Sequence, residues 1–234
     1  MIAERLRVEI LEASRVLAKS GLVMGTFGNV SGVDREAGLF VIKPSGVDYE
    51  KLTPADMVPV SLADGSVLEG KLRPSSDTPT HLELYRAFEC GGVVHTHSEF
   101  ATAFAQARLP VRCMGTTHAD HFRGDVPVTR PLTHEEIAGE YERETGRVIV
   151  ETLRTANLRP DEIFAVLVSN HGPFTWGKDA LDAVEQARTL EYLARMEATV
   201  RAIAPDAPRP DPALVDRHFW RKHGATAYYG QNKK

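Results

Sequence analysis

The stretch Val93-Val94-His95-Thr96-His97-Ser98 carries the strongest structural signal in this chain. An apolar run leads into it, and one residue separates the two histidines. Side chains two apart on a β-strand leave the same face. We therefore expect both imidazoles to point at one spot and Thr96 to face away. The stretch predicts a buried strand that ends in two metal ligands.

A third histidine follows a second apolar run. Residues 163–168 are typical of a strand, and His171 comes shortly after them. Each histidine taken by itself is more often packed or solvated than bound to a metal. As a set, three imidazoles and an open coordination position would form a catalytic rather than a structural metal site.

The bulk composition limits the class of protein. The 234 residues suit one large domain or two small ones, and 42% hydrophobic residues are ample for a core. A net charge of −4 gives no reason to expect a nucleic-acid partner. Cys90 and Cys113 fit neither a zinc spacing nor a disulfide framework. The N-terminus does not resemble a signal peptide, and no apolar stretch could span a bilayer. We expect a cytoplasmic protein without a membrane partner.

Strands and helices are expected to be interspersed in a single α/β layered domain. Short apolar runs between turn residues predict strands at 39–42, 57–62 and 163–168. Helical spacing and capping signals predict helices at 2–19, 78–88, 99–107 and 179–203, and from the Thr133–Glu136 capping box to about 153. Residues 25–32 are expected to form a loop, and the short strands favour antiparallel pairing.

Three small polar loops are candidates for binding an anion. Gly28-Asn29 lets a ligand approach the backbone and offers an amide. Lys43-Pro44-Ser45-Gly46 offers an ammonium beside a hydroxyl, and Ser75-Ser76 precede an expected helix N-terminus. Each could be an ordinary turn or cap, but together they indicate a phosphate pocket. A P-loop and a GxGxxG motif are both missing, so a nucleotide is not implied.

Four further residues have an ordinary structural interpretation, and Asp77 and Asp120 have a chemical one as well. Asp77 either assists the cap of the helix expected at 78–88 or places a carboxylate near the metal, as ligand or base. Asp120 either belongs to a solvated loop or serves as an acid/base group. A tyrosine near the C-terminus, such as Tyr229, is ordinarily packed or unordered, and only its context would make it catalytic. His218 is most simply a helix residue at an interface.

Together these motifs resemble the class II aldolase/adducin-head family and, within it, the L-ribulose-5-phosphate 4-epimerases. The resemblance covers nearly the whole chain, and aldolases and epimerases share its first loops and the His-x-His. The subgroup markers are Asp77, where aldolases usually carry glutamate, the block 116–120 and the tail 227–231. His121, where a tyrosine is common, and Ser169-Asn170 depart from the pattern but replace no expected ligand or acid/base group.

The resemblance implies a three-layer α/β/α sandwich with a mostly antiparallel central sheet, in one domain over residues 1–234. It implies a divalent metal, zinc first with manganese or cobalt as alternatives, held by His95, His97 and His171. Asp77 would lie at or beside the metal. It also implies a homotetramer with four-fold symmetry and active sites between subunits, in which the segment 205–234 reaches a neighbouring subunit.

The implied activity is the interconversion of L-ribulose 5-phosphate and D-xylulose 5-phosphate. Because C4 carries no acidic proton, we expect retro-aldol cleavage of C3–C4 and re-addition on the other face, with the metal as Lewis acid. Asp120 and Tyr229 are expected to move the C4 hydroxyl proton, with His218 or the metal supplying positive charge near the tyrosine, and Tyr229 and His218 coming from the neighbouring subunit. The expected substrate-binding residues are Gly28, Asn29, Lys43, Ser45, Gly46, Ser75, Ser76, Thr116 and Glu142.

Two alternatives share part of this pattern. A sugar-phosphate aldolase, such as a fuculose-1-phosphate aldolase, would use the same metal and phosphate loops but release its fragments. A non-enzymatic adducin-like binding module should lack a complete histidine set, and this chain has all three histidines.

Overall fold

A six-stranded sheet forms the centre of the protein in the computed structural model, which describes residues 1–224 and 227–228. The strands lie in the order β3-β2-β1-β4-β6-β5, and every neighbouring pair is antiparallel. In chain order they are β1 (Asn29–Asp34), β2 (Leu39–Ile42), β3 (Val58–Ser61), β4 (Gly92–His95), β5 (Ala165–Leu167) and β6 (Pro173–Gly177).

Helices occupy most of the remaining chain. The α-helices are α1 (Glu4–Lys19), α2 (Thr78–Ala87), α3 (Glu99–Ala107), α4 (Thr116–Ala119), α5 (His134–Ala138), α6 (Tyr141–Thr155), α7 (Ala180–Ile203) and α8 (Pro212–His223). Two short 3-10 helices, η1 (Tyr49–Lys51) and η2 (Pro54–Asp56), lie between β2 and β3. Within the described chain, none of these helices combines the length and apolar composition needed to cross a membrane.

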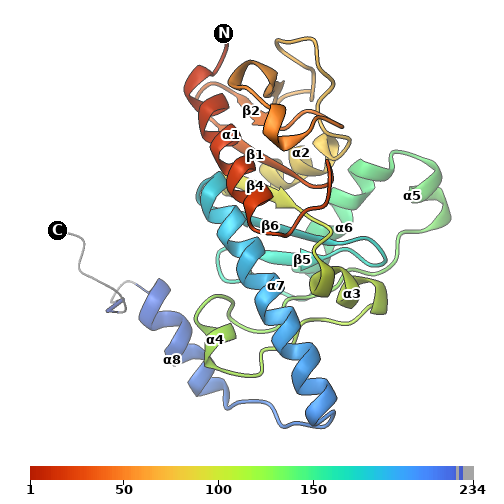
Figure 1. The fold of residues 1–234 in the computed structure, drawn as a ribbon. Helices are drawn as coiled ribbons and strands as arrows, with labels where there is room; N and C mark the ends of the chain where they lie inside the picture. The colour runs from red at the N-terminus through yellow and green to blue at the C-terminus, as the bar shows by residue number, and fades with distance from the viewer. Residues whose placement is uncertain (225–226, 229–234) are drawn as a thin grey trace.

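Helices cover both faces of the sheet and produce the expected three layers (Figure 1). One apolar cluster joins α1 and the start of α7 to one face, and the other joins α2, α3 and α6 to the opposite face. All four residues of β2 are apolar because both faces of this strand are buried. Leu39 and Val41 belong to the first cluster, whereas Phe40 and Ile42 belong to the second. The expected α/β/α sandwich is confirmed.

The prediction of a loop over residues 25–32 is wrong for its second half. Residues 29–32 begin β1, which pairs with β2 on one side and β4 on the other. The apolar pattern missed this strand because Asn29 and Ser31 are polar although buried. Ser31 is stabilised there by hydrogen bonds of 2.7 Å with both His81 and Tyr85. Strand β6 also lay outside the expected elements.

The helix expected from the capping box to about 153 is divided in two. Thr133 and Glu136 do form a capping box, but α5 ends at Ala138. Gly139 closes it with a backbone hydrogen bond of 2.9 Å to the carbonyl of Glu135. The chain then turns and starts α6 at Tyr141, so that the first turn of α6 faces the pocket described below.

Candidate metal centre

His95 is the last residue of β4, where its neighbours in the sheet are Asn29 of β1 and Phe174 of β6. Its side chain is buried, and Nδ1 lies 2.9 Å from the carbonyl oxygen of Pro173. Because a carbonyl oxygen can only accept, this bond assigns the ring proton to Nδ1. The Nε2 lone pair of His95 is therefore free to bind a metal.

His97 lies beyond the end of β4, so the expectation that both histidines sit within the strand is wrong. The two rings converge nevertheless, with their Nε2 atoms 3.0 Å apart and their centroids 4.8 Å apart. Burial, together with His95, lowers the pKa of His97 and favours a neutral ring. Two ring nitrogens that approach each other this closely are an arrangement that a shared cation would stabilise.

His171 completes the group from the turn between β5 and β6. Its ring centroid lies 4.7 Å from that of His95 and 5.1 Å from that of His97. The next residue is Gly172, where a Cβ atom would come within 2.7 Å of the carbonyl oxygen of Thr96. Only a glycine at this position lets the turn approach the strand end closely enough to bring His171 to the other two rings.

The three imidazoles together fit a divalent metal. One ligand atom from each lies within 4.8 Å of the other two. Burial, reinforced by His95, lowers the pKa of His171 to about 4, so its ring stays neutral, which is the form that binds metals. Three histidine nitrogens and an open position suit zinc, and cobalt or manganese also accept such ligands. The sequence prediction of this convergence is confirmed.

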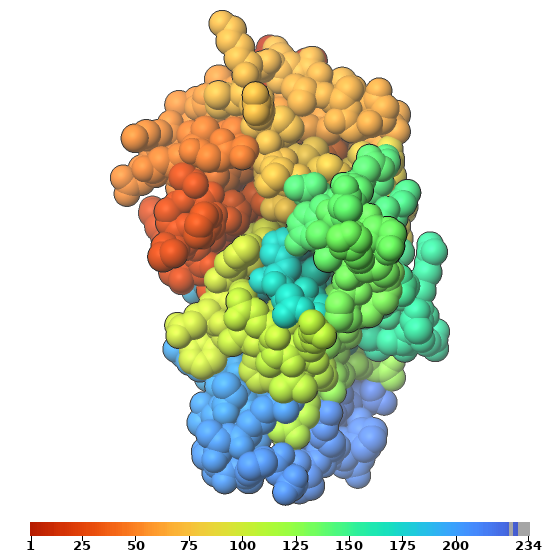
Figure 2. Space-filling model, turned by 90° about the vertical axis from the view of Figure 1, so that its right-hand side faces the viewer, coloured from red at the N-terminus to blue at the C-terminus, as the bar shows by residue number. Residues whose placement is uncertain are grey.

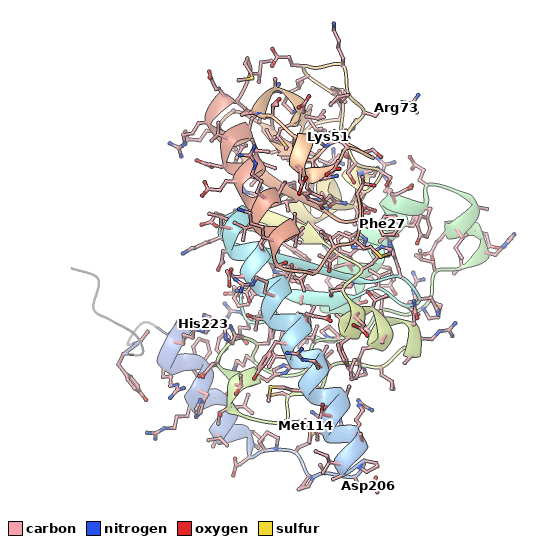
Figure 3. The ribbon with its side chains drawn as sticks, viewed as in Figure 1. Phe27, Lys51, Arg73, Met114, Asp206 and His223 are labelled. Atoms are coloured by element: carbon pink, nitrogen blue, oxygen red, sulfur yellow. The ribbon has the colours of Figure 1, made fainter. Side chains whose placement is uncertain are left out.

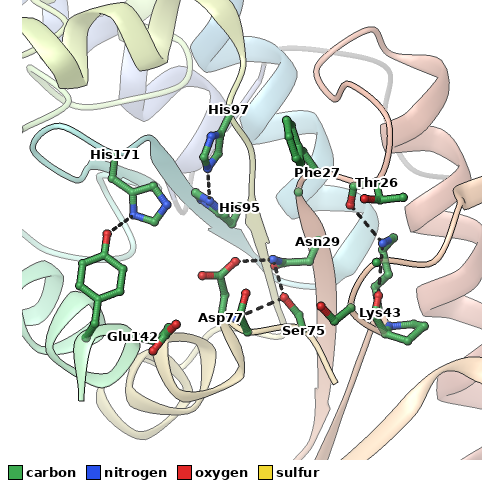
Figure 4. A pocket seen from close by; sticks show the side chains of 16 residues that line it. Thr26, Phe27, Asn29, Lys43, Ser75, Asp77, His95, His97, Glu142 and His171 are labelled. Carbon is green, nitrogen blue, oxygen red and sulfur yellow. Dashed lines mark hydrogen bonds between the residues drawn. The ribbon is translucent and has the colours of Figure 1, made fainter. Parts of the chain in front are cut away.

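Asp77 lies beside the histidines (Figure 4). It occupies the N-cap position of α2, but its side chain makes no capping bond. Its carboxylate instead accepts a hydrogen bond of 2.7 Å from the Asn29 amide. Burial opposes its ionisation, but the nearby His95 and His81 and the Asn29 amide hold the pKa of Asp77 below its ordinary value. The geometry favours the interpretation that places a carboxylate near the metal over that of a simple cap.

Tyr141 is a site residue that the sequence analysis did not single out. Its hydroxyl lies 3.3 Å from Nδ1 of His171. That contact orients the ring so that Nε2 faces the other two histidines. The division of the expected long helix places Tyr141 at this point, and nothing in the local spacing predicts that break except Gly139.

A cavity of about 380 Å³ runs from the histidines to the three polar loops. Figure 2 shows it as a hollow, in which the cyan segment near residue 170 lies recessed between the red, yellow-green and green segments. Its lining contains all the expected metal-binding residues and eight of the nine expected substrate-binding residues. These eight are Gly28, Asn29, Lys43, Ser45, Gly46, Ser75, Ser76 and Glu142.

The loops at the far end of the cavity are held together by their backbones. The amide of Ser75 donates to the carbonyl of Lys43 at 3.1 Å, and the amide of Ser45 donates to that of Arg73 at 3.0 Å. The Asn29 amide donates to the hydroxyl of Ser75 at 2.9 Å as well as to Asp77. Asn29 therefore links the metal end of the cavity to the polar end.

Lys43 gives the polar end its positive charge. Its side chain is 1% exposed and forms no ion pair with a carboxylate in the described chain. The ammonium lies 4.5 Å from the ring centroid of Tyr49 and within 3.4 Å of the carbonyls of Thr26 and Pro44. Burial lowers its pKa to about 8, although Asp48 opposes the shift. A buried ammonium that makes no ion pair within the described residues is suited to bind an anion.

The remaining predicted residues lie elsewhere. Thr116 and Asp120 are in or beside α4, and His218 is in α8, which packs on α4. This pair of helices lies at the opposite end of the molecule from β2 (Figure 1). Figure 3 shows His223 of α8 well separated from Phe27 of the pocket lining. None of these three residues lines the cavity formed by the described part of this chain. Tyr229 lies outside the described residues.

A sequence model of the Class II Aldolase and Adducin N-terminal domain matches residues 8–198. The chain belongs to the class II aldolase and adducin family.

Several solved structures share this fold. An L-fuculose 1-phosphate aldolase is 25% identical with a TM-score of 0.77, covering 93% of this chain and 96% of its own. The L-fuculose-1-phosphate aldolase from Thermus thermophilus is 28% identical with a TM-score of 0.67, and the match covers 88% of this chain and 99% of the aldolase. YgbL from Klebsiella pneumoniae, a putative aldolase/epimerase/decarboxylase, is 24% identical with a TM-score of 0.72, and the match covers 93% of this chain and 99% of YgbL.

Proposed function

We propose that this member of the class II aldolase family is a metal-dependent epimerase that interconverts L-ribulose 5-phosphate and D-xylulose 5-phosphate. The observation that carries the proposal is the placement of His95, His97 and His171 at one end of a cavity whose other end holds the buried ammonium of Lys43. That spacing suits a sugar phosphate whose oxygenated carbons meet the metal while its phosphate meets the lysine. The subgroup markers, above all Asp77 and the block around Asp120, favour an epimerase.

The reaction needs a bond to break and reform without the loss of either fragment. The C4 hydroxyl gives its proton to a base, the C3–C4 bond breaks, and its electron pair remains on the ketone fragment. The aldehyde fragment turns, the electron pair attacks its other face, and an acid returns the proton. A divalent metal, when bound, supplies Lewis-acid stabilisation of the charge that develops on the ketone fragment.

The polar loops would hold the aldehyde fragment through its phosphate. The Lys43 ammonium, the hydroxyls of Ser45, Ser75 and Ser76, and the backbone at Gly28 and Gly46 surround this end of the cavity. A fixed phosphate keeps the aldehyde carbon close to its partner, so that recombination is effectively intramolecular. Asn29 would place Asp77 and Ser75 rather than bind phosphate through its amide, because that amide already donates to both.

The acid and base would come from the α4–α8 end of a second subunit. Asp120 and Tyr229 are the proposed groups, with His218 beside them, and Thr116 would lie at the same substrate. The described chain keeps Thr116, Asp120 and His218 away from its own cavity, which favours their delivery by the segment 205–234 and its neighbours in a homotetramer. The assembly is therefore part of the proposal.

A second candidate is a sugar-phosphate aldolase that releases both fragments. The structural likeness to two L-fuculose 1-phosphate aldolases favours it, since both exceed or reach 25% identity over most of their length. The same metal and phosphate ends would serve this reaction. The two candidates differ in whether the aldehyde is retained after the bond breaks.

One assay separates the candidates. The purified protein is loaded with zinc, its metal content is measured, and the same sample is incubated with L-ribulose 5-phosphate under NMR observation. Appearance of D-xylulose 5-phosphate supports the epimerase, and accumulation of free glycolaldehyde phosphate supports the aldolase. A sample that binds no metal and converts nothing would support an adducin-like binding role instead.

A further inference from the structure

The mouth of the cavity carries an aromatic side chain that the proposed mechanism has not used. Phe27 lines the cavity, yet it is 55% exposed. Its ring centroid lies 6.2 Å from that of His97. Figure 4 shows the ring between His97 at the metal end and Lys43 at the phosphate end. The apolar ring thus borders the part of the cavity that a bound substrate would cross.

The backbone around Phe27 is fixed on several sides. The buried hydroxyl of Tyr49 donates to the carbonyls of Phe27 at 3.0 Å and Gly28 at 2.9 Å. Gly28 has a φ of 75°, and a Cβ atom there would lie 2.9 Å from the carbonyl oxygen of His95. The Lys43 ammonium holds the carbonyl of Thr26 at 3.4 Å. The backbone that carries the phenyl ring is therefore held at the edge of the cavity, which a wall against a substrate requires.

We propose that Phe27 is a specificity-determining residue that confines the aldehyde fragment while it turns, an inference that rests on the proposed function. After C3–C4 breaks, the phosphate stays at the Lys43 end and the aldehyde carbon swings between its two faces. The carbon and its oxygen move next to the phenyl ring, which closes one exit and keeps water out. Phe27 thereby favours recombination, which completes epimerisation, over escape, which would complete an aldol cleavage.

The test measures how the reaction divides between the two products. Zinc-loaded wild type and Phe27→Ala are incubated with L-ribulose 5-phosphate, and D-xylulose 5-phosphate and released glycolaldehyde phosphate are both quantified by NMR. We expect the ratio of released aldehyde to epimer to rise about tenfold in Phe27→Ala, equivalent to about 1.4 kcal/mol. Metal content should not change, because the ring donates no ligand.

Matched variants make the result specific. Met24→Ala removes a side chain of the same loop that is 74% exposed and outside the cavity lining, so its product ratio should equal that of wild type. Phe27→Leu keeps apolar bulk and should stay close to wild type. Phe27→Val serves as the truncation if Phe27→Ala does not fold, as judged by thermal unfolding.

The outcomes separate this inference from the function on which it rests. A wild type that epimerises, together with a truncated variant whose ratio is unchanged, overturns the role of Phe27 and leaves the epimerase intact. An equal rise in Met24→Ala would also overturn that role. A wild type that does not interconvert the two pentulose phosphates refutes the proposed function and the role of Phe27 with it.

Discussion

Nδ1 of His218 lies 3.0 Å from a carboxylate oxygen of Asp120, although 98 positions separate the two residues in the chain. Arg221, one turn further along α8, donates to both oxygens of the same carboxylate at 3.0 and 2.9 Å. Partial burial opposes ionisation, but these two partners hold the pKa of Asp120 below its ordinary value. Helix α8 thus fixes a charged carboxylate in a set orientation.

Asp120→Asn should keep the metal and lose epimerisation. Loss of a positioned acid/base group typically costs about 10²–10⁴-fold in rate, and we expect a decrease of that size in kcat. Product formation by NMR and metal content on the same sample provide the measurement. Asp125→Asn is the control, because Asp125 also binds an arginine, Arg209, through both oxygens. Normal turnover in Asp120→Asn would remove Asp120 from the mechanism.

His97→Asn should abolish or severely weaken metal binding. Loss even of a residue that merely orients a ligand costs about 10–100-fold in metal affinity, so loss of a ligand should exceed that. Metal affinity by competition with a chelator, and zinc content after dialysis, measure the effect. His134→Asn, at an exposed histidine outside the cavity, should bind zinc like wild type. Full activity of a metal-analysed His97→Asn sample would refute the ligand assignment.

Tyr141→Phe should weaken the metal site without removing a ligand. The variant loses the hydroxyl that contacts Nδ1 of His171, so the ring is less well oriented. We expect about a tenfold decrease in zinc affinity, measured by chelator competition on the protein without substrate. Tyr192→Phe, at a half-exposed tyrosine of α7, provides the control. Unchanged affinity in Tyr141→Phe would show that His171 is held by its turn alone.

Substrate binding should weaken as pH rises through about 8. Burial lowers the pKa of Lys43 to about 8 in the folded protein, so the charged form dominates below this value and is lost above it. The apparent Kd for inorganic phosphate should therefore approach a tenfold increase per pH unit above 8. Titration by calorimetry at pH 7, 8 and 9 measures it.

A variant tests the assignment of that titration to Lys43. Lys43→Gln should bind phosphate weakly at pH 7 and show no further loss up to pH 9. Lys51→Gln, at an exposed lysine, should retain the wild-type dependence. A wild-type profile that stays flat between pH 7 and 9 would contradict the role of Lys43 as the phosphate cation.

Most elements follow from local patterns in the sequence. The expected helix at 99–107 matches α3, and the expected strand at 39–42 matches β2. These two predictions are correct because the pattern of apolar residues and the signals that mark the ends of the element coincide on the same residues. Strand β1 was missed because its buried Ser31 is stabilised by two partners from α2, His81 and Tyr85, which no local pattern reveals.

The sequence by itself determined the chemistry available to this protein. It supplies three candidate metal-ligand histidines, three polar loops, and the apolar runs that build a sheet between two layers of helices. Tertiary structure decided how these groups meet. It brought His97 to His95 beyond the end of a strand, placed Tyr141 behind His171 and Phe27 at the cavity mouth, and kept Asp120 away from the cavity. The reason is physical, since side-chain identity and spacing act over a few residues, whereas these distances depend on packing between segments far apart in the chain.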